Sequence, residues 1–168
     1  MNIELRPIQS HERETLRNIW EKYDYEFSQF DHRDVDEFGL YGDKDLAYYW
    51  SKETKWLYFI LVDAKIAGFA AVTNLPIVED TKTDFQIGEF FVLFKYRRLG
   101  VGKAAFFQLL ALHPGQHQLV RHPQNTLSVH FWNHVVAAYT KGHYTLVQAH
   151  PGFLYADGTP GDVFFFKT

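Results

Sequence analysis

The sequence predicts a single α/β domain in which strands and helices interleave. The chain has 168 residues, 46% of them hydrophobic, which is enough for one core of ordinary size. Seven apolar stretches have the length and residue types of strands, and four others repeat apolar residues at helical spacing. Their order is strand, helix, helix, three strands, helix, strand, helix and two strands.

The first half of the chain predicts five elements, namely strands over residues 2–8, 56–62 and 66–72, a helix after Ser10 and a short helix over residues 43–51. Ser10 can cap the first helix, in which apolar residues recur at steps of three or four from Leu16 to Phe30. This apolar face is either core or the wall of a cleft. The last two strands are joined by residues 63–65, which is short enough for an antiparallel hairpin.

Residues 86–92 predict the central strand, which follows a loop over residues 74–82. Ile87, Glu89 and Phe91 alternate along it with Gly88, Phe90 and Val92. A basic link with two glycines then opens a helix that ends before Pro114. The remaining elements are a strand over residues 117–121, a helix over 125–139 and strands over 143–148 and 162–167.

The start of the helix after the central strand is a candidate anion site. The first N–H groups of a helix lack partners within it and lie at the positive end of its dipole. Arg97 and Arg98 precede this start, and Gly100 and Gly102 would let a phosphate come close to the main chain. The alternative is a tight strand-to-helix turn with solvated basic residues.

Two known phosphate loops fit this turn poorly. A Walker loop needs a glycine where the chain has Arg97 and a Ser or Thr where it has Ala104. The glycines do fit the relaxed dinucleotide pattern G-x-G-x-x-A, but that pattern also needs an acidic residue about 20 positions further on. No acidic residue occurs over residues 90–156, so a nucleotide-dependent oxidoreductase stays only as an alternative.

The same residues carry a resemblance to a known family. The segment 97–102 matches R/Q-x-x-G-x-G/A, the signature of the GNAT superfamily of acyl-CoA-dependent N-acyltransferases, and Val92 lies five residues ahead of it, as is usual there. A second match, to the N-x-x-A-x-x-[FL]-[YW] helix, is formed by Asn125, Ser128, Phe131 and Trp132, with Ser for Ala. The order of strands and helices agrees as well, so the resemblance covers nearly the whole chain.

The resemblance implies a fold and a set of cofactor-binding residues. The fold is one GNAT-like domain over residues 1–168, with a central mixed sheet of about seven strands flanked by helices on both faces. The cosubstrate would be acetyl-CoA, bound in part by main-chain N–H groups around Val92 that a bulge in the strand exposes. The implied binding residues are Phe91, Val92, Arg97, Arg98, Leu99, Gly100, Val101, Gly102, Lys103, Asn125 and Trp132.

Composition excludes several kinds of protein. There is no cysteine, so disulfides, thiolate metal sites and a thiol nucleophile are excluded. No apolar run approaches the roughly 18 residues of a membrane span, and the start does not resemble a signal peptide, so we expect a cytoplasmic protein without a membrane partner. His130 and His134 lie four positions apart but lack the Glu of H-E-x-x-H, and we expect no metal.

Charge is distributed unevenly along the chain. Residues 1–89 carry 18 of the 20 acidic and 10 of the 17 basic residues, a net charge of −8, whereas residues 90–168 have a net charge of +5. A polyanion such as CoA suits the basic half. We do not expect nucleic acid as a partner, because the whole protein is acidic and no dense Lys/Arg cluster occurs.

Residues 21–45 are rich in carboxylates and aromatic rings, a combination that attracts cations. In the GNAT resemblance this region borders the acceptor pocket, so Tyr23, Tyr25 and Glu26 are candidate substrate-binding residues. We expect a small cationic acceptor such as a polyamine, an amino sugar or an amino-acid derivative. The alternative is that these charges are solvated and the rings turn inward. The loop over residues 150–161 either rims this pocket or is a simple hairpin connection, and a homodimer is kept as a possible assembly.

Transfer to an amine needs a base, because an alkyl ammonium with a pKa near 10 must lose its proton. Glu89 is the candidate general base, since the resemblance places it just before the point where two parallel strands splay. Its neighbours Phe90 and Phe91 would desolvate it. The alternative is a structural carboxylate that pairs with an arginine such as Arg97.

The sequence departs from the family at the group that protonates the leaving thiolate. Much of the family has a Tyr where this chain has Trp132, and an indole N–H is a hydrogen-bond donor but not a usable acid. Tyr139 lies about 10 Å further along the helix axis. The proton donor therefore stays unassigned.

We therefore predict an N-acetyltransferase that moves an acetyl group from acetyl-CoA to a primary amine by direct attack. The alternative from another class is a non-catalytic acyl-CoA-binding module, which the replacement of the Tyr by Trp132 favours.

Overall fold

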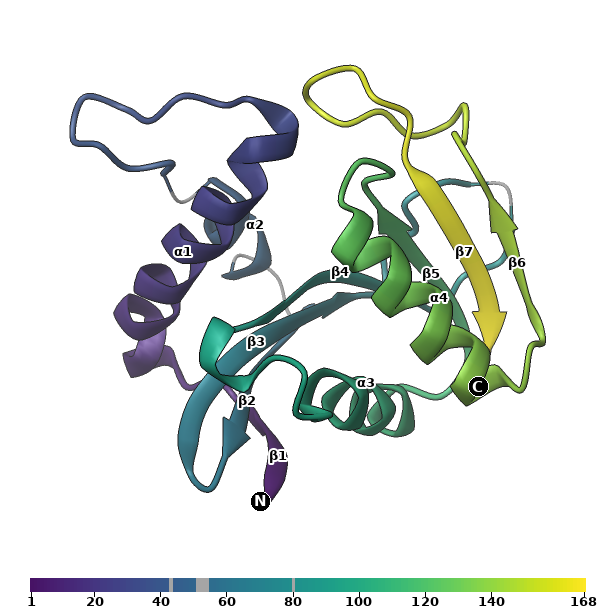
Figure 1. The fold of residues 1–168 in the computed structure, drawn as a ribbon, viewed down its shortest axis with the longest axis horizontal. Helices are drawn as coiled ribbons and strands as arrows, with labels where there is room; N and C mark the ends of the chain where they lie inside the picture. The colour runs from purple at the N-terminus through teal and green to yellow at the C-terminus, as the bar shows by residue number, and fades with distance from the viewer. Residues whose placement is uncertain (43, 51–54, 80) are drawn as a thin grey trace.

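The computed structural model describes residues 1–42, 44–50, 55–79 and 81–168 (Figure 1). In this part of the chain the helices are α1 (Arg13–Asp31), α2 (Lys44–Trp50), α3 (Val101–Leu112) and α4 (Thr126–Thr140). The strands are β1 (Ile3–Pro7), β2 (Lys55–Val62), β3 (Lys65–Thr73), β4 (Phe85–Val92), β5 (Gln116–Arg121), β6 (Tyr144–Val147) and β7 (Asp162–Lys167). The predicted order is confirmed; the two end residues of the helix predicted over residues 43–51 lie outside the described residues.

Within the described residues the strands form one seven-stranded sheet in the order β1-β2-β3-β4-β5-β7-β6. Only β4 and β5 run parallel, and every other neighbouring pair is antiparallel. A tight turn at Asp63 and Ala64, both with positive φ, closes the predicted hairpin between β2 and β3. The mixed sheet is therefore confirmed, and its one parallel pair lies at its centre.

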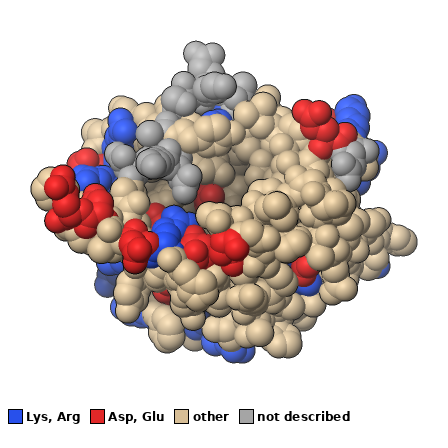
Figure 2. Space-filling model, turned by 90° about the horizontal axis from the view of Figure 1, so that it is seen from above, with Lys and Arg blue, Asp and Glu red and all other residues tan. Residues whose placement is uncertain are grey.

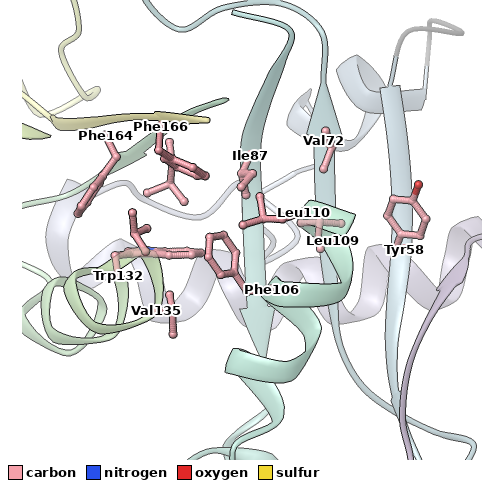
Figure 3. Close-up of a cluster of buried hydrophobic side chains, with 13 residues drawn as sticks. Tyr58, Val72, Ile87, Phe106, Leu109, Leu110, Trp132, Val135, Phe164 and Phe166 are labelled. Carbon is pink, nitrogen blue, oxygen red and sulfur yellow. The ribbon is translucent and has the colours of Figure 1, made fainter. Parts of the chain in front are cut away.

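Helices cover both faces of the sheet, as predicted. Leu16 and Trp20 of α1 pack with Leu46 of α2 against Phe59 and Phe69, on one face. On the other face α3 and α4 share a larger core with the alternate residues of the same strands, and Figure 3 shows the side chains that form it. Since the rings of Trp132 and Phe106 lie 5.4 Å apart in this core, α4 is fixed against α3.

The start of the first helix differs from its prediction. Ser10 does not cap α1; it begins a short 3₁₀ turn, η1 (Ser10–Glu12), and α1 starts only at Arg13. The Glu12 carboxylate accepts the Gln9 N–H (2.9 Å) and two hydrogen bonds from Arg6 (2.7 and 2.9 Å). A carboxylate with three donors holds this corner more strongly than a serine hydroxyl would, which is why the turn precedes the helix.

Strand β4 contains a bulge that a regular alternation of side chains does not predict. Ile87 pairs with Val72 and Glu89 with Ala71, so Gly88 is the extra residue. Because of this extra residue, side chains after the bulge lie on the opposite face of the sheet from the one that regular alternation would give them. Ile87 consequently packs with the α3 and α4 core, whereas Phe91 packs with α1 and α2.

Candidate active site

The candidate site opens where β4 and β5 separate. These strands pair over only three residues each, the last pair being Ile87 with Leu119. Glu89 follows two residues later, just past the start of the splay rather than before it, and β4 continues to Val92 beside β3 alone. The carboxyl ends of two parallel strands thus diverge and leave a space between them, a common place for a ligand site in an α/β sheet.

Main-chain donors of β4 face this space. Leu93 donates its N–H to the Ala67 carbonyl of β3 (2.7 Å), and along an antiparallel pair the main-chain groups of successive residues point alternately toward and away from the partner. The N–H groups of Phe90 and Val92 therefore point away from β3, into the splay. The expected bulge lies at Gly88 rather than at Val92, so it is the loss of the β5 partner that exposes these donors.

The glycine turn opens α3 beside the same space. Gly100 is the N-cap with φ 79°, a conformation that glycine adopts without strain, and within the described residues no side chain caps this helix start. At Gly102 a Cβ would lie 3.0 Å from the Phe131 ring of α4, so a larger residue would press the two helices apart. The arrangement leaves the first N–H groups of α3 available to an anion.

The start of α4 forms the opposite wall. Asn125 is its N-cap, and its side-chain oxygen accepts the Ser128 N–H (3.1 Å). Trp132 is 8% exposed and packs edge-on against Phe90, with ring centroids 5.4 Å apart. Tyr139 packs instead against Phe107 of α3 (4.9 Å), so the structure does not bring it to the site.

Helix α1 supplies the third wall and two polar contacts. Tyr23 donates its O–H to Oε2 of Glu89 (2.6 Å). Glu26 accepts hydrogen bonds from Nη2 of Arg97 (2.7 and 2.8 Å), and Nε of the same arginine donates to the Val92 carbonyl (2.7 Å). Arg97 thus ties α1 to the end of β4. Tyr25 points to solvent and is 70% exposed, and the structure does not bring it to the cleft.

These walls enclose a cleft of about 710 Å³ between α1, the end of β4, the start of α3 and the first half of α4. Nine of the residues predicted for the site line it: Tyr23, Glu26, Phe91, Val92, Arg97, Arg98, Gly102, Asn125 and Trp132. Glu89, which is bonded to the lining residue Tyr23, and Gly100 are not among the lining residues. Leu99 and Lys103 are exposed on the turn, and the Val101 side chain is buried in the core, so Val101 could face a ligand only through its main chain.

Two aromatic residues beyond the predicted set pack behind the rings of Phe27 and Phe30, which line the cleft. His122 follows β5, and its ring lies 4.6 Å from that of Tyr155, which belongs to the loop before β7. Burial and the Glu89 carboxylate raise the pKa of Tyr155 above its ordinary range, so its hydroxyl stays protonated. No motif marks either residue, because they meet only through the fold.

Figure 2 shows the end of the molecule where the loops after α1 and before β7 lie, with a hollow near its middle and acidic side chains mainly along the α1 side. Within the described ranges, no three His, Asp or Glu side chains are grouped to hold a metal ion. Over the same ranges no helix is both long and apolar enough to cross a membrane.

The sequence matches the model of the acetyltransferase (GNAT) family over residues 11–135. The chain belongs to the GNAT family. It is accordingly an acyl-CoA-dependent N-acetyltransferase, with acetyl-CoA as its cosubstrate. The predictions of the family, the fold, the enzyme class and the cosubstrate are confirmed, and the oxidoreductase alternative is not supported.

Solved GNAT-type structures share the fold at low sequence identity. The PaiA N-acetyltransferase from Thermoplasma acidophilum, in complex with coenzyme A, has a TM-score of 0.64 at 14% identity, with 100% of both chains covered. An acetyltransferase from Thermus thermophilus has a TM-score of 0.70 at 9% identity, covering 100% of this chain and 98% of that one. A spermidine N-acetyltransferase chimera from Vibrio cholerae has a TM-score of 0.61 at 10% identity, covering 99% and 96%. No curated protein sequence matches the chain.

Proposed function

We propose that residues 1–168 form one N-acetyltransferase domain that acetylates the primary amine of a small cationic molecule by direct attack, with Glu89 as the general base. The observation that carries the proposal is the position of Glu89 at the opening between β4 and β5, where Tyr23 holds its carboxylate. A cytoplasmic location and a homodimer stay predictions.

Glu89 would take a proton from the ammonium group, directly or through water, and the neutral nitrogen would then attack the thioester carbonyl carbon. The negative charge that develops on the carbonyl oxygen needs donors, and the N–H groups of Phe90 and Val92 face the splay. The C–S bond then breaks and the CoA thiolate leaves. Trp132 can donate a hydrogen bond to the thiolate but no proton, so the proton comes from another source.

The phosphates of acetyl-CoA would lie at the start of α3. Gly100 and Gly102 keep this helix start open, and Arg98 lines the same cleft. Arg97 supports the site indirectly, because its guanidinium bonds Glu26 and the Val92 carbonyl. Asn125 and Trp132 complete the opposite wall.

The substitution Glu89→Gln tests the base. It removes the acceptor of the proton at nearly constant shape, so we expect kcat to fall by about a hundredfold or more while the affinity for acetyl-CoA is kept. Turnover is measured as CoA release with an amine, and affinity by isothermal titration. An unchanged kcat would exclude Glu89 as the base, and CoA binding without turnover in the wild type would favour the binding-module alternative.

A further inference from the structure

The carboxylates on the site side of α1 are bonded within the protein. Glu26 accepts two hydrogen bonds from Arg97 (2.7 and 2.8 Å). Asp24 and Asp31 are buried and both form ion pairs with Arg33. A carboxylate that already has a guanidinium partner offers little to a second cation.

The other acidic side chains of this region support the loop or face solvent. Glu21 accepts the Tyr41 N–H (3.0 Å), and Asp36 accepts two main-chain N–H groups of its own loop (2.9 Å each). Asp34 and Glu37 are exposed on the same loop. The acidic side chains that the structure describes over residues 21–37 therefore stabilise the fold or face solvent, and they do not form a site for a polycation.

Aromatic rings form a continuous wall that leads outward from Glu89. Along α1, Phe27 lies 5.9 Å from Tyr23 and 5.8 Å from Phe30, and both phenylalanines line the cleft. His122 at the end of β5 stacks on Phe30 (5.7 Å, 30°), and Tyr155 lies 5.8 Å from Phe27. His122 is buried and Tyr155 does not line the cleft, so these two rings pack behind Phe27 and Phe30 and hold them in place.

We infer that the acceptor is a primary amine that carries its single ammonium group on an aromatic or similarly flat apolar body. Its amine would lie at Glu89, and its ring would stack along Phe27 and Phe30. This inference rests on the proposed function and narrows it, because it excludes polyamines and amino sugars as the preferred acceptors.

Desolvation is the physical reason for this preference. An aromatic body gains from burial against rings and needs no polar partner. A second ammonium at this wall would lose its water, while the nearby carboxylates of α1 are held by Arg33 and Arg97, and Asp157, beside His122, accepts hydrogen bonds from Thr159. The hydroxyl groups of a sugar would likewise lose hydrogen bonds to water against Phe27 and Phe30.

The test is a comparison of three amines with acetyl-CoA, followed as CoA release: 2-phenylethylamine, spermidine and glucosamine. We expect kcat/KM for 2-phenylethylamine to exceed that of the other two by about tenfold or more, the size expected for burial of a ring. The variant Phe30→Leu keeps apolar volume but removes the ring, and should raise KM for 2-phenylethylamine with little change in kcat. Phe30→Glu adds a carboxylate to the wall and should move the preference toward spermidine.

The matched control is Phe107→Leu, which removes a part-buried ring that packs on Tyr139 outside the cleft. It should leave the order of the three amines unchanged. If wild type prefers spermidine or glucosamine, or if Phe30→Leu leaves KM unchanged, the inference is overturned and the proposed function still stands. If the protein binds acetyl-CoA but acetylates none of the three amines, both are overturned.

Discussion

The phenolic O–H of Tyr23 on α1 donates a hydrogen bond of 2.6 Å to Oε2 of Glu89 on β4. Burial and the neighbouring Glu89 carboxylate raise the pKa of Tyr23 well above its ordinary range, so this tyrosine stays protonated and remains a donor. A donor fixed in this way orients the carboxylate and stabilises its ionised form, which is the form that a general base needs.

The variant Tyr23→Phe tests this role. Loss of a hydrogen bond to a charged group costs about 1.5–3 kcal/mol, so we expect kcat/KM for the amine to fall by about ten- to a hundredfold. Without the donor the carboxylate takes up a proton at higher pH, so the acid limb of the pH–rate profile should move upward. Tyr41→Phe is the control, because the hydroxyl group of Tyr41, in the loop after α1, bonds the Ser28 hydroxyl of α1 and not Glu89. An unmoved acid limb in Tyr23→Phe would show that the contact is only structural.

The glycine turn is tested by Gly100→Asp. Gly100 has φ 79°, and an aspartate there would add both backbone strain and a negative charge at the start of α3. We expect the affinity for CoA, measured by isothermal titration, to fall by about a hundredfold. Gly142→Asp is matched to it, since Gly142 has φ 83° and equally open surroundings but follows α4 away from the cleft. Similar losses in both variants would point to instability rather than to a phosphate site.

The bulge in β4 leads to a third prediction, which concerns stability. A Cβ on Gly88 would clash with the hydroxyl group of Tyr49, so Gly88→Ala must displace the Tyr49 side chain, α2 or the strand. We expect a loss of about 1–3 kcal/mol in the free energy of unfolding, the usual range for overpacking. Tyr49→Phe in the same chain should recover part of this loss. Denaturant unfolding of the two single variants and the double variant measures the coupling, and additive effects would contradict the clash.

Stability should depend on pH through a histidine outside the site. Burial lowers the pKa of His117 to about 4, against an unfolded value near 6.5. The unfolded chain therefore binds more protons between these values, and stability is lost as the pH falls from about 6.5 to about 4, by about 2 kcal/mol at pH 5. Urea unfolding at pH 7 and pH 5 measures this loss, to which His113, whose pKa burial also lowers, adds.

The ring of His117 stacks on that of Phe166, with centroids 5.2 Å apart. The variant His117→Phe keeps a ring at this position, but the phenyl ring cannot take up a proton. This variant should lose less stability than wild type at pH 5. His143→Phe, at an exposed position, is the control and should follow the wild type. Equal losses in wild type and His117→Phe would contradict the prediction.

Local patterns were sufficient for much of the fold. The continuous apolar runs that became β2 and β3 and the start of the helix at residue 125 were recognised because each depends on residues close in sequence. Ser10 was assigned wrongly because Glu12 meets Arg6 from β1, and the position of the expected bulge, at Gly88, could not be predicted because it accommodates Tyr49 from α2. In both cases a contact from another element overrode the local preference.

The sequence by itself determined the family, the glycine turn at the start of α3 and the place of Glu89 on the central strand, since these depend on spacing within one segment. Only the tertiary structure decided which partner each charged group has. Arg97 bonds Glu26, Tyr23 holds Glu89, and Arg33 pairs with Asp24 and Asp31. The physical reason is that ion pairs and aromatic walls join side chains from different elements, whose distances exist only after the sheet and its helices have packed.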